Sequence, residues 1–302
     1  MKKTVLAFAV AAAMGVPAVA AADTTLYGLF DTSIDYVNDA ATTTRMANNS
    51  SRLGVRGSED LGGGLSGIFQ LEMSFDSTDT QDEGVTDNRN TFVGLAGDFG
   101  SLRLGQFDSA YKTSFNPANF LGLTWGDIAS VLKRGLEARE ANIVQYSSPN
   151  INGLRVAADY TVDDKDYSLS GSYSAGSLMV MAAYRNESDV TDDAAYMVGG
   201  TFTIDDLTLA AVYENRNSNN GYLLAARYNL GQVYIAANYM DDGADAKQFA
   251  LGGGYRFSSR TQAYVAVANN DGGDLAGNSG KGRDELTGVD GTAFSVGVRH
   301  SF

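Results

Sequence analysis

From Asp23 onward, apolar and polar residues alternate with a period of two, and this pattern continues to the last residue. In the final eleven residues one parity is apolar and consists of Phe294, Val296, Val298 and Phe302. Successive side chains of a β-strand point to opposite faces, so the pattern predicts strands with one apolar and one polar face. Chain ends fray unless they are held, and an open sheet edge in lipid leaves backbone groups unsatisfied. A terminal strand ending on Phe302 therefore favours a sheet closed on itself, with lipid outside and water inside.

Composition is consistent with such a barrel and argues against several other classes. Mean hydropathy is only −0.17, as expected when lipid-facing and water-facing residues alternate. After residue 22 no run of 18 apolar residues occurs, so no transmembrane helix is predicted. The net charge of −14 argues against nucleic-acid binding through bulk electrostatics.

The side chains needed for common catalytic and metal chemistry are scarce. The chain has no cysteine and one histidine, His300, which lies on the apolar parity of the last strand. Zinc sites and Ser-His-Asp or Cys-His catalysis therefore lack their usual parts. We expect no enzyme activity, no metal and no cofactor. The Asp-rich and Gly-rich segment 271–290 lacks the spacing of a calcium loop and is predicted to be a solvated outer loop.

Residues 1–22 are predicted to be a cleavable signal peptide. Lys2 and Lys3 precede an apolar run, Gly15 and Pro17 interrupt it, and Ala20–Ala22 supply small residues before Asp23. The alternative is a retained helical anchor. Cleavage would remove two lysines and no acids, which takes the net charge from −14 to −16 and leaves residues 23–302 as the mature chain.

Grouped as hairpins, the alternating segments number about sixteen. They are residues 25–36, 51–59, 65–75, 89–95, 101–107, 139–147, 154–161, 166–174, 178–186, 195–203, 207–215, 222–229, 233–240, 248–257, 261–269 and 292–302. Short turns alternate with longer polar loops, for which 76–88, 215–221 and 271–291 are the candidates. Sixteen strands of about ten residues enclose an interior too wide for side chains to fill. We therefore predict an all-β, 16-stranded antiparallel transmembrane β-barrel around an aqueous channel. A secreted soluble β-sandwich is the alternative.

Tyrosines recur near strand ends on the apolar parity. They are Tyr160, Tyr173, Tyr184, Tyr196, Tyr213, Tyr228, Tyr239 and Tyr255. An amphipathic ring suits the boundary between membrane and water, so we expect aromatic belts there. The alternative is that tyrosine simply favours strands.

Charged residues on the polar parity are predicted to line the interior. Arg52 lies opposite the face of Leu53 and Val55, and the same parity argument applies to three further residues, Arg56, Arg103 and Glu72. Asp108 to about Glu137 is the longest stretch without clean alternation; it contains Trp125 and a predicted short helix at Gly126–Leu136.

Several motifs resemble those of the general diffusion porins of Gram-negative outer membranes. They are Ser51-Arg52-Leu53-Gly54-Val55-Arg56-Gly57-Ser58-Glu59-Asp60-Leu61-Gly62, Arg89-Asn90-Thr91-Phe92-Val93-Gly94-Leu95, Phe99-Gly100-Ser101-Leu102-Arg103-Leu104-Gly105 and Gly297-Val298-Arg299-His300-Ser301-Phe302. The matches follow the family's order across the predicted mature chain, and together they are specific.

The resemblance implies a trimer of sixteen-stranded barrels in the outer membrane that passes small hydrophilic solutes and ions by diffusion. It implies that the third outer loop, here about residues 108–137, folds inward and narrows each pore. The basic wall of that constriction would consist of Arg52, Arg89 and Arg139, and Asp127 would be the acid of the loop. It also implies contacts with outer-membrane lipids and lipopolysaccharide, and recognition of the C-terminal strand with Phe302 by the barrel-assembly machinery.

The sequence departs from the family pattern at several positions. Leu29 replaces a common basic residue, Gln106 follows Gly105 where an arginine is common, and the loop lacks the acidic Pro-Glu-Phe-Gly-Gly segment of some members. These departures affect pore size and selectivity more than the fold. A substrate-specific channel, a surface adhesin and an outer-membrane enzyme on the same barrel stay open as alternatives.

Overall fold

The strands of the protein form one closed antiparallel sheet. The structure, a computed structural model, describes residues 23–38, 42–78, 85–132, 139–187, 194–216, 218–271 and 291–302. The predicted signal peptide, residues 1–22, lies outside these ranges, as does most of the predicted loop 271–291. The strands are β1 (Asp23–Asn38), β2 (Thr42–Asn48), β3 (Arg52–Gly62), β4 (Leu65–Phe75), β5 (Val85–Asn88), β6 (Thr91–Gly97), β7 (Gly100–Asp108), β8 (Arg139–Ser147), β9 (Leu154–Thr161), β10 (Tyr167–Ala175), β11 (Leu178–Asn186), β12 (Ala194–Ile204), β13 (Leu207–Arg216), β14 (Asn219–Leu230), β15 (Val233–Asp241), β16 (Lys247–Arg256), β17 (Thr261–Asp271) and β18 (Gly291–Ser301).

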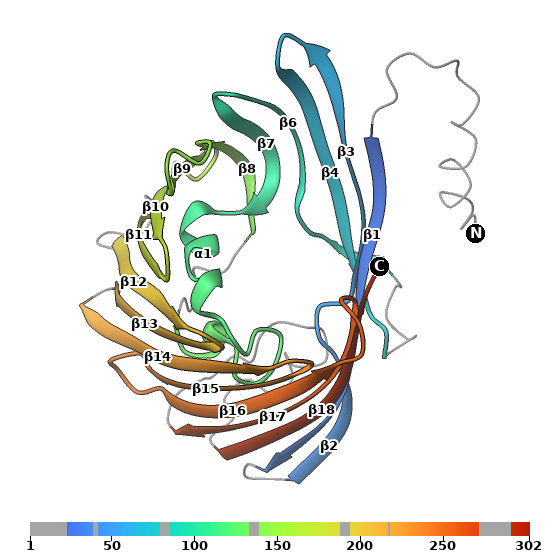
Figure 1. The fold of residues 1–302 in the computed structure, drawn as a ribbon, viewed down its shortest axis with the longest axis vertical. Helices are drawn as coiled ribbons and strands as arrows, with labels where there is room; N and C mark the ends of the chain where they lie inside the picture. Colours follow the sequence, from blue (N-terminus) through green and yellow to red (C-terminus); the bar gives the residue numbers. More distant parts are fainter. Residues whose placement is uncertain are drawn as a thin grey trace.

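These eighteen segments amount to sixteen barrel strands. β2 and β3 both pair with β1 and are two parts of one interrupted strand. β5 and β6 are likewise two parts of the strand that pairs with β4. The ring closes between β1 and β18, in register from Leu29↔Ser301 to Asn38↔Thr292, and Figure 1 shows these two strands side by side. The predicted 16-stranded antiparallel barrel is confirmed.

Several predicted boundaries are wrong. β2 (Thr42–Asn48) was not predicted, and the loop expected at 76–88 ends in a strand, β5 (Val85–Asn88). The strand expected at 89–95 is broken, because Arg89 and Asn90 lie between β5 and β6. There the Asn90 side chain accepts a hydrogen bond from the backbone of Asp108 instead of continuing the ladder. The long loop expected at 215–221 is absent, since β13 runs to Arg216 and β14 begins at Asn219.

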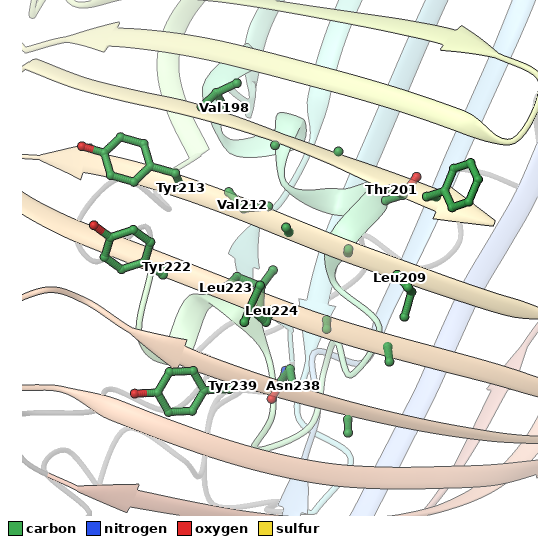
Figure 2. Close-up of a pocket in the computed structure, with 18 of the residues that line it drawn as sticks. Val198, Thr201, Leu209, Val212, Tyr213, Tyr222, Leu223, Leu224, Asn238 and Tyr239 are labelled. Atoms are coloured by element: carbon green, nitrogen blue, oxygen red, sulfur yellow. The ribbon is translucent and has the colours of Figure 1, made fainter. Parts of the chain in front are cut away.

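The outer face of the barrel is apolar and carries two aromatic belts. At the end that carries the short turns 176–177, 205–206 and 231–232, the belt contains Tyr173, Phe202, Tyr228 and Tyr255. At the other end it contains Tyr160, Tyr167, Tyr184, Tyr196, Tyr213, Tyr222 and Tyr239. Figure 2 shows Tyr213, Tyr222 and Tyr239 at the same end of neighbouring strands. The tyrosines predicted at strand ends therefore divide between two levels about one strand length apart, as an amphipathic ring at each membrane surface requires.

None of the helices within the described ranges is both long enough and apolar enough to cross a membrane.

Residues 109–132 lie inside the ring of strands. Figure 1 shows α1 (Ala110–Ser114) enclosed by the barrel. Two single 3-10 turns follow, η1 (Asn116–Ala118) and η2 (Ile128–Ser130). The helix predicted at Gly126–Leu136 is wrong within the described range, where only η2 occurs, and residues 133–138 lie outside it. α1 was not predicted; Ser109 caps it by accepting a hydrogen bond from the Lys112 backbone.

Small apolar residues line part of the inner wall on β11–β18, between charged and polar side chains of the same strands. Inward-facing alanines on β11–β18 are buried under residues 109–132; they are Ala183, Ala195, Ala210, Ala225, Ala236, Ala250, Ala268 and Ala293. Tyr111, Phe115 and Ile128 pack on one group, and Leu121 and Trp125 on the other. The expectation of a uniformly polar inner face is therefore wrong for this part of the wall. The small side chains leave room for the apolar side chains of residues 109–132, and packing between the two buries apolar surface away from water.

Gly105 on β7 is a position where only glycine fits. Its φ is +154°, and a Cβ there would overlap the carbonyl oxygen of Thr91 on β6. We expect Gly105→Ala to destabilise the barrel by roughly 2 kcal/mol or more, seen as a lower temperature for loss of the SDS-resistant folded band. Gly171→Ala is the control, because a Cβ at Gly171 would lie 3.9 Å from the Arg155 carbonyl oxygen, an ordinary van der Waals contact. Equal melting of the two variants would contradict this account.

Candidate functional site

Glu72, on β4, organises a cluster of basic side chains on the inner wall. Its carboxylate lies 2.7 Å from Nε of Arg89 and 3.8 Å from Nε of Arg52. The hydroxyl of Tyr27 donates to the same carboxylate at 2.9 Å. Glu72 is buried, so its charge is held by these partners and not by bulk water. The lumen candidate Glu72 and two of the predicted wall arginines thus meet at one place.

The third predicted arginine, Arg139, adjoins the same region through Asn90. Its Nε donates to Asn90 at 3.1 Å and lies 3.5 Å from the carboxylate of Asp108. Lys112 of α1 also pairs with Asp108, at 2.9 Å. We call Arg52, Arg89 and Arg139 the arginine wall. With Lys112, the arginine wall brings four cations together around the carboxylates of Glu72 and Asp108.

The arginine wall keeps partial access to the interior. The side chains of Arg52, Arg89 and Arg139 retain 27%, 14% and 23% exposure, respectively. A positive charge that is held in place but still accessible can act on ions passing beside it.

The other two arginine candidates are held by aromatic rings. The guanidinium of Arg56 lies 5.0 Å from the ring centroid of Tyr27. That of Arg103 lies 4.7 Å from Phe107 and 5.0 Å from Phe92, and donates to Gln145. Stacking on a ring fixes a guanidinium without neutralising it.

Asp127 lies within residues 109–132, which we call the inward segment, and its side chain stabilises the turns of this segment. The carboxylate accepts hydrogen bonds from the backbones of Leu123 and Ala129, at 2.7 and 3.0 Å, and from Asn119 at 3.0 Å. It is buried and caps η2. Its role as the acid that faces the arginine wall stays a prediction.

Hydrogen bonds anchor the inward segment to inner-wall residues far away in the sequence. Trp125 Nε1 donates to Asp35 on β1 at 3.0 Å, and Asn238 on β15 donates to the Gly126 carbonyl at 2.6 Å. At the start of the segment, the Tyr111 hydroxyl donates to Glu214 on β13 at 2.6 Å. Burial and the neighbouring Glu214 carboxylate raise the pKa of Tyr111, so this hydroxyl stays protonated and remains a donor at physiological pH.

A polar network ties the segment to the seam between β1 and β18. Arg299 donates to Asp31 at 2.6 Å and to the Gly122 carbonyl at 3.1 Å. Tyr264 donates to the other oxygen of Asp31 at 2.7 Å, and Asn49 donates to Tyr264 at 2.8 Å. Sequence reasoning missed these roles. The parity of Asp31 was visible, but its partners come from strands that become neighbours only when the ring closes.

A second ionic cluster, also missed, centres on Arg185 of β11. Its guanidinium pairs with Glu140, Asp166 and Glu187 at 2.7, 3.3 and 3.1 Å. His300 lies on the outer face and its Nδ1 is 2.8 Å from the Thr261 hydroxyl. Among the described residues, no three acidic or histidine side chains converge closely enough to hold a metal ion.

Comparisons with known proteins agree on one family. A family model described as Gram-negative porin matches residues 8–275. Outer membrane porin protein 32 of Delftia acidovorans is 36% identical over 183 residues, covering 55% of this chain and 51% of that relative, so the match spans about half of its length. Major outer membrane protein P.IB of Neisseria meningitidis serogroup A is 30% identical over an aligned length of 352, covering 100% of both chains. The solved structure of an anion-selective porin from Comamonas acidovorans superimposes with a TM-score of 0.77 at 24% identity, covering 93% of this chain and 100% of that one.

The chain's single tryptophan reports on how the inward segment is held. Trp125 is 1% exposed and donates to Asp35. We expect Asp35→Ala to loosen this contact, at a cost of about 1–3 kcal/mol, and to give red-shifted emission and stronger acrylamide quenching. Asp206→Asn, on an exposed turn, is the control and leaves the spectrum unchanged. Unchanged quenching in Asp35→Ala would contradict the anchoring role.

Proposed function

Because the chain belongs to the family of Gram-negative porins, we infer that it is an outer-membrane porin through which small hydrophilic solutes and ions diffuse passively. The observation that carries this conclusion is a closed sixteen-stranded ring that is apolar outside and holds a charged, partly accessible wall inside. A ring of this strand number encloses an aqueous channel. Its outer face, with two aromatic belts, suits a bilayer.

The narrowing of the channel is proposed to lie between the arginine wall and residues 109–132. The segment occupies the side of the lumen that β11–β18 line with alanine, where its apolar side chains are buried. The arginine wall lies on β3, the β5–β6 break and β8, away from that side. Solutes would then pass along the arginines, with Lys112 at the start of the segment contributing a further positive charge.

The local charge supports a preference for anions. Four cations gather at this place, and the three arginines keep partial contact with the interior. Fixed charges at a narrowing favour ions of the opposite sign. The overall net charge of −14 does not oppose this, because exposed charges farther than about 8 Å are screened at physiological salt.

We also propose the assembly partners that the family implies. The barrel would associate as a homotrimer and contact outer-membrane lipids and lipopolysaccharide. The C-terminal strand would be recognised by the assembly machinery. The ring of Phe302 covers Gly28 on the outer face, and the two residues exchange backbone hydrogen bonds of 3.1 Å. This accounts structurally for an aromatic last residue, since it seals the end of the seam.

Enzymatic activity is not proposed. A serine–histidine hydrolase would need its histidine beside a nucleophile in the lumen or at the rim. His300 is instead exposed on the outer face, next to Thr261 on the strand beside it.

Planar-bilayer recordings test both the channel and its charge selectivity. We expect stepwise conductance, and a chloride-to-potassium permeability ratio that falls about twofold to fivefold in Arg52→Ala, Arg89→Ala or Arg139→Ala, because a unit charge about 4 Å away contributes roughly 1 kcal/mol in water. Glu72→Gln should shift the reversal potential in the opposite direction.

Arg260→Gln is the matched control, because Arg260 lies on the exposed turn between β16 and β17. If folded protein gave no current, the proposed channel function would be wrong. An unchanged ratio in all three arginine variants would remove the arginine wall from the selectivity filter.

A further inference from the structure

A second group of arginines surrounds a buried tyrosine on the inner wall of β14–β16. The guanidinium of Arg227 lies 4.5 Å, and that of Arg256 4.9 Å, from the ring centroid of Tyr234. Tyr234 is 8% exposed, so it supplies a fixed platform for both. Nearby guanidinium groups repel each other, and stacking on one ring compensates only part of that repulsion.

Neither arginine is neutralised. Within the described ranges no carboxylate forms an ion pair with Arg227 or Arg256. Arg256 donates to Asn229 at 3.0 Å and to the Gly231 carbonyl at 3.5 Å, both neutral acceptors. Among the described residues, the buried Nε of Arg227 has no hydrogen-bond partner. A cation without a counter-charge is costly in such surroundings, and an anion that binds to the terminal N–H groups of Arg227 would supply that counter-charge.

A pocket lies beside this group. It has a volume of about 330 Å³ and is enclosed by residues 119–124 of the inward segment and by the wall. Its polar lining includes Arg227, Tyr234, Gln262, Tyr264 and Arg299. Arg299 gives two of its five N–H donors to Asp31 and Gly122, whereas Arg227 donates to none of the described residues, so Arg227 is the cation in the lining with the most donor capacity. The side-chain amide of Gln262 has no partner among the described residues and adds a neutral donor.

The strand registers join this pocket to the arginine wall. Gln262 on β17 lies directly opposite Arg256 on one side and Arg299 on the other. Across the seam, Leu29 of β1 pairs with Ser301 of β18 and with Arg52 of β3. Only one strand therefore separates Arg299 from Arg52. Arginines therefore follow one another around the inner wall, in the order Arg139, Arg89, Arg52, Arg299, Arg256 and Arg227. Arg256 and Arg227 lie near the strand ends that carry the short turns.

We propose that the pocket between residues 119–124 and Arg227 is a binding site for a small oxyanion, a carboxylate or a phosphate, within the lumen. The guanidinium of Arg227 presents N–H groups in the planar geometry that carboxylate and phosphate oxygens match. The ring of Tyr234 holds it in position, and Arg256, stacked on the same ring, adds positive potential. Anions in the lumen would thus have a second binding site in addition to the arginine wall. This proposal rests on the proposed channel function.

Line broadening of the ³¹P signal of inorganic phosphate, titrated with the full-length folded protein in detergent, tests the site without requiring conduction. We expect broadening that saturates, with an apparent dissociation constant about tenfold weaker in Arg227→Gln and Arg256→Gln, as the loss of a charge-assisted contact predicts. Acetate and succinate are added as competitors. Displacement by them shows that the site takes carboxylates, and its absence restricts the site to phosphate.

Two further variants locate the binding. Arg155→Gln removes an exposed arginine of the inner parity on β9, outside this pocket, and is expected to bind like the unchanged protein. Arg52→Gln is expected to weaken binding less than Arg227→Gln. Equal weakening in Arg155→Gln or Arg52→Gln, or no saturable broadening, would overturn the proposal.

Conductance in potassium chloride, recorded on the same preparations, separates the two hypotheses. Current without phosphate binding removes only the site. Phosphate binding without current removes the channel function and leaves the site. SDS-resistant folded bands confirm that each variant has formed its barrel, so a loss of binding cannot be due to misfolding.

Discussion

Closure of the sheet between β1 and β18 is the constraint on which the rest of the structure depends. In lipid every backbone N–H and C=O must pair within the protein, and the first and last strands satisfy this by pairing from Leu29↔Ser301 to Asn38↔Thr292. On the inner side of the same seam, Arg299 and Asp31 form an ion pair that Tyr264 completes. On the outer side, Phe302 covers Gly28. β1 and β18 are therefore joined by backbone, ionic and apolar contacts at once.

The closed ring of sixteen strands is too wide for wall side chains to fill. The inward segment fills part of this space, against β11–β18. Alanines on β11–β18 leave space for Tyr111, Leu121 and Trp125, which bury their apolar surface there. The arginine wall keeps partial access to the interior. The lumen is therefore asymmetric, with an apolar part that positions the inward segment and a charged part that carries the arginine wall.

Parity predicted the strands well because alternation is a local property that each segment shows by itself. The bounds of β8, β9 and β11 agree with the prediction at both ends. It also placed Arg52 and Glu72 on the same face of neighbouring strands. It failed at Arg89 and Asn90, where a side chain replaces a ladder partner. It failed again for the alanines of β11–β18, since alanine fits an inner or an outer face equally and its environment depends on what packs against it.

The sequence by itself determined that the chain forms strands, which parity faces lipid, and that the sheet must close, because the period of side chains and the cost of unpaired backbone in lipid act on every segment alike. Only the tertiary structure decided which charges meet. Arg299 and Arg52 belong to strands at opposite ends of the chain, and Arg227 reaches its pocket only after residues 119–124 fold inward. Such contacts depend on register around the whole ring and on the path of an irregular segment, which no local periodicity encodes.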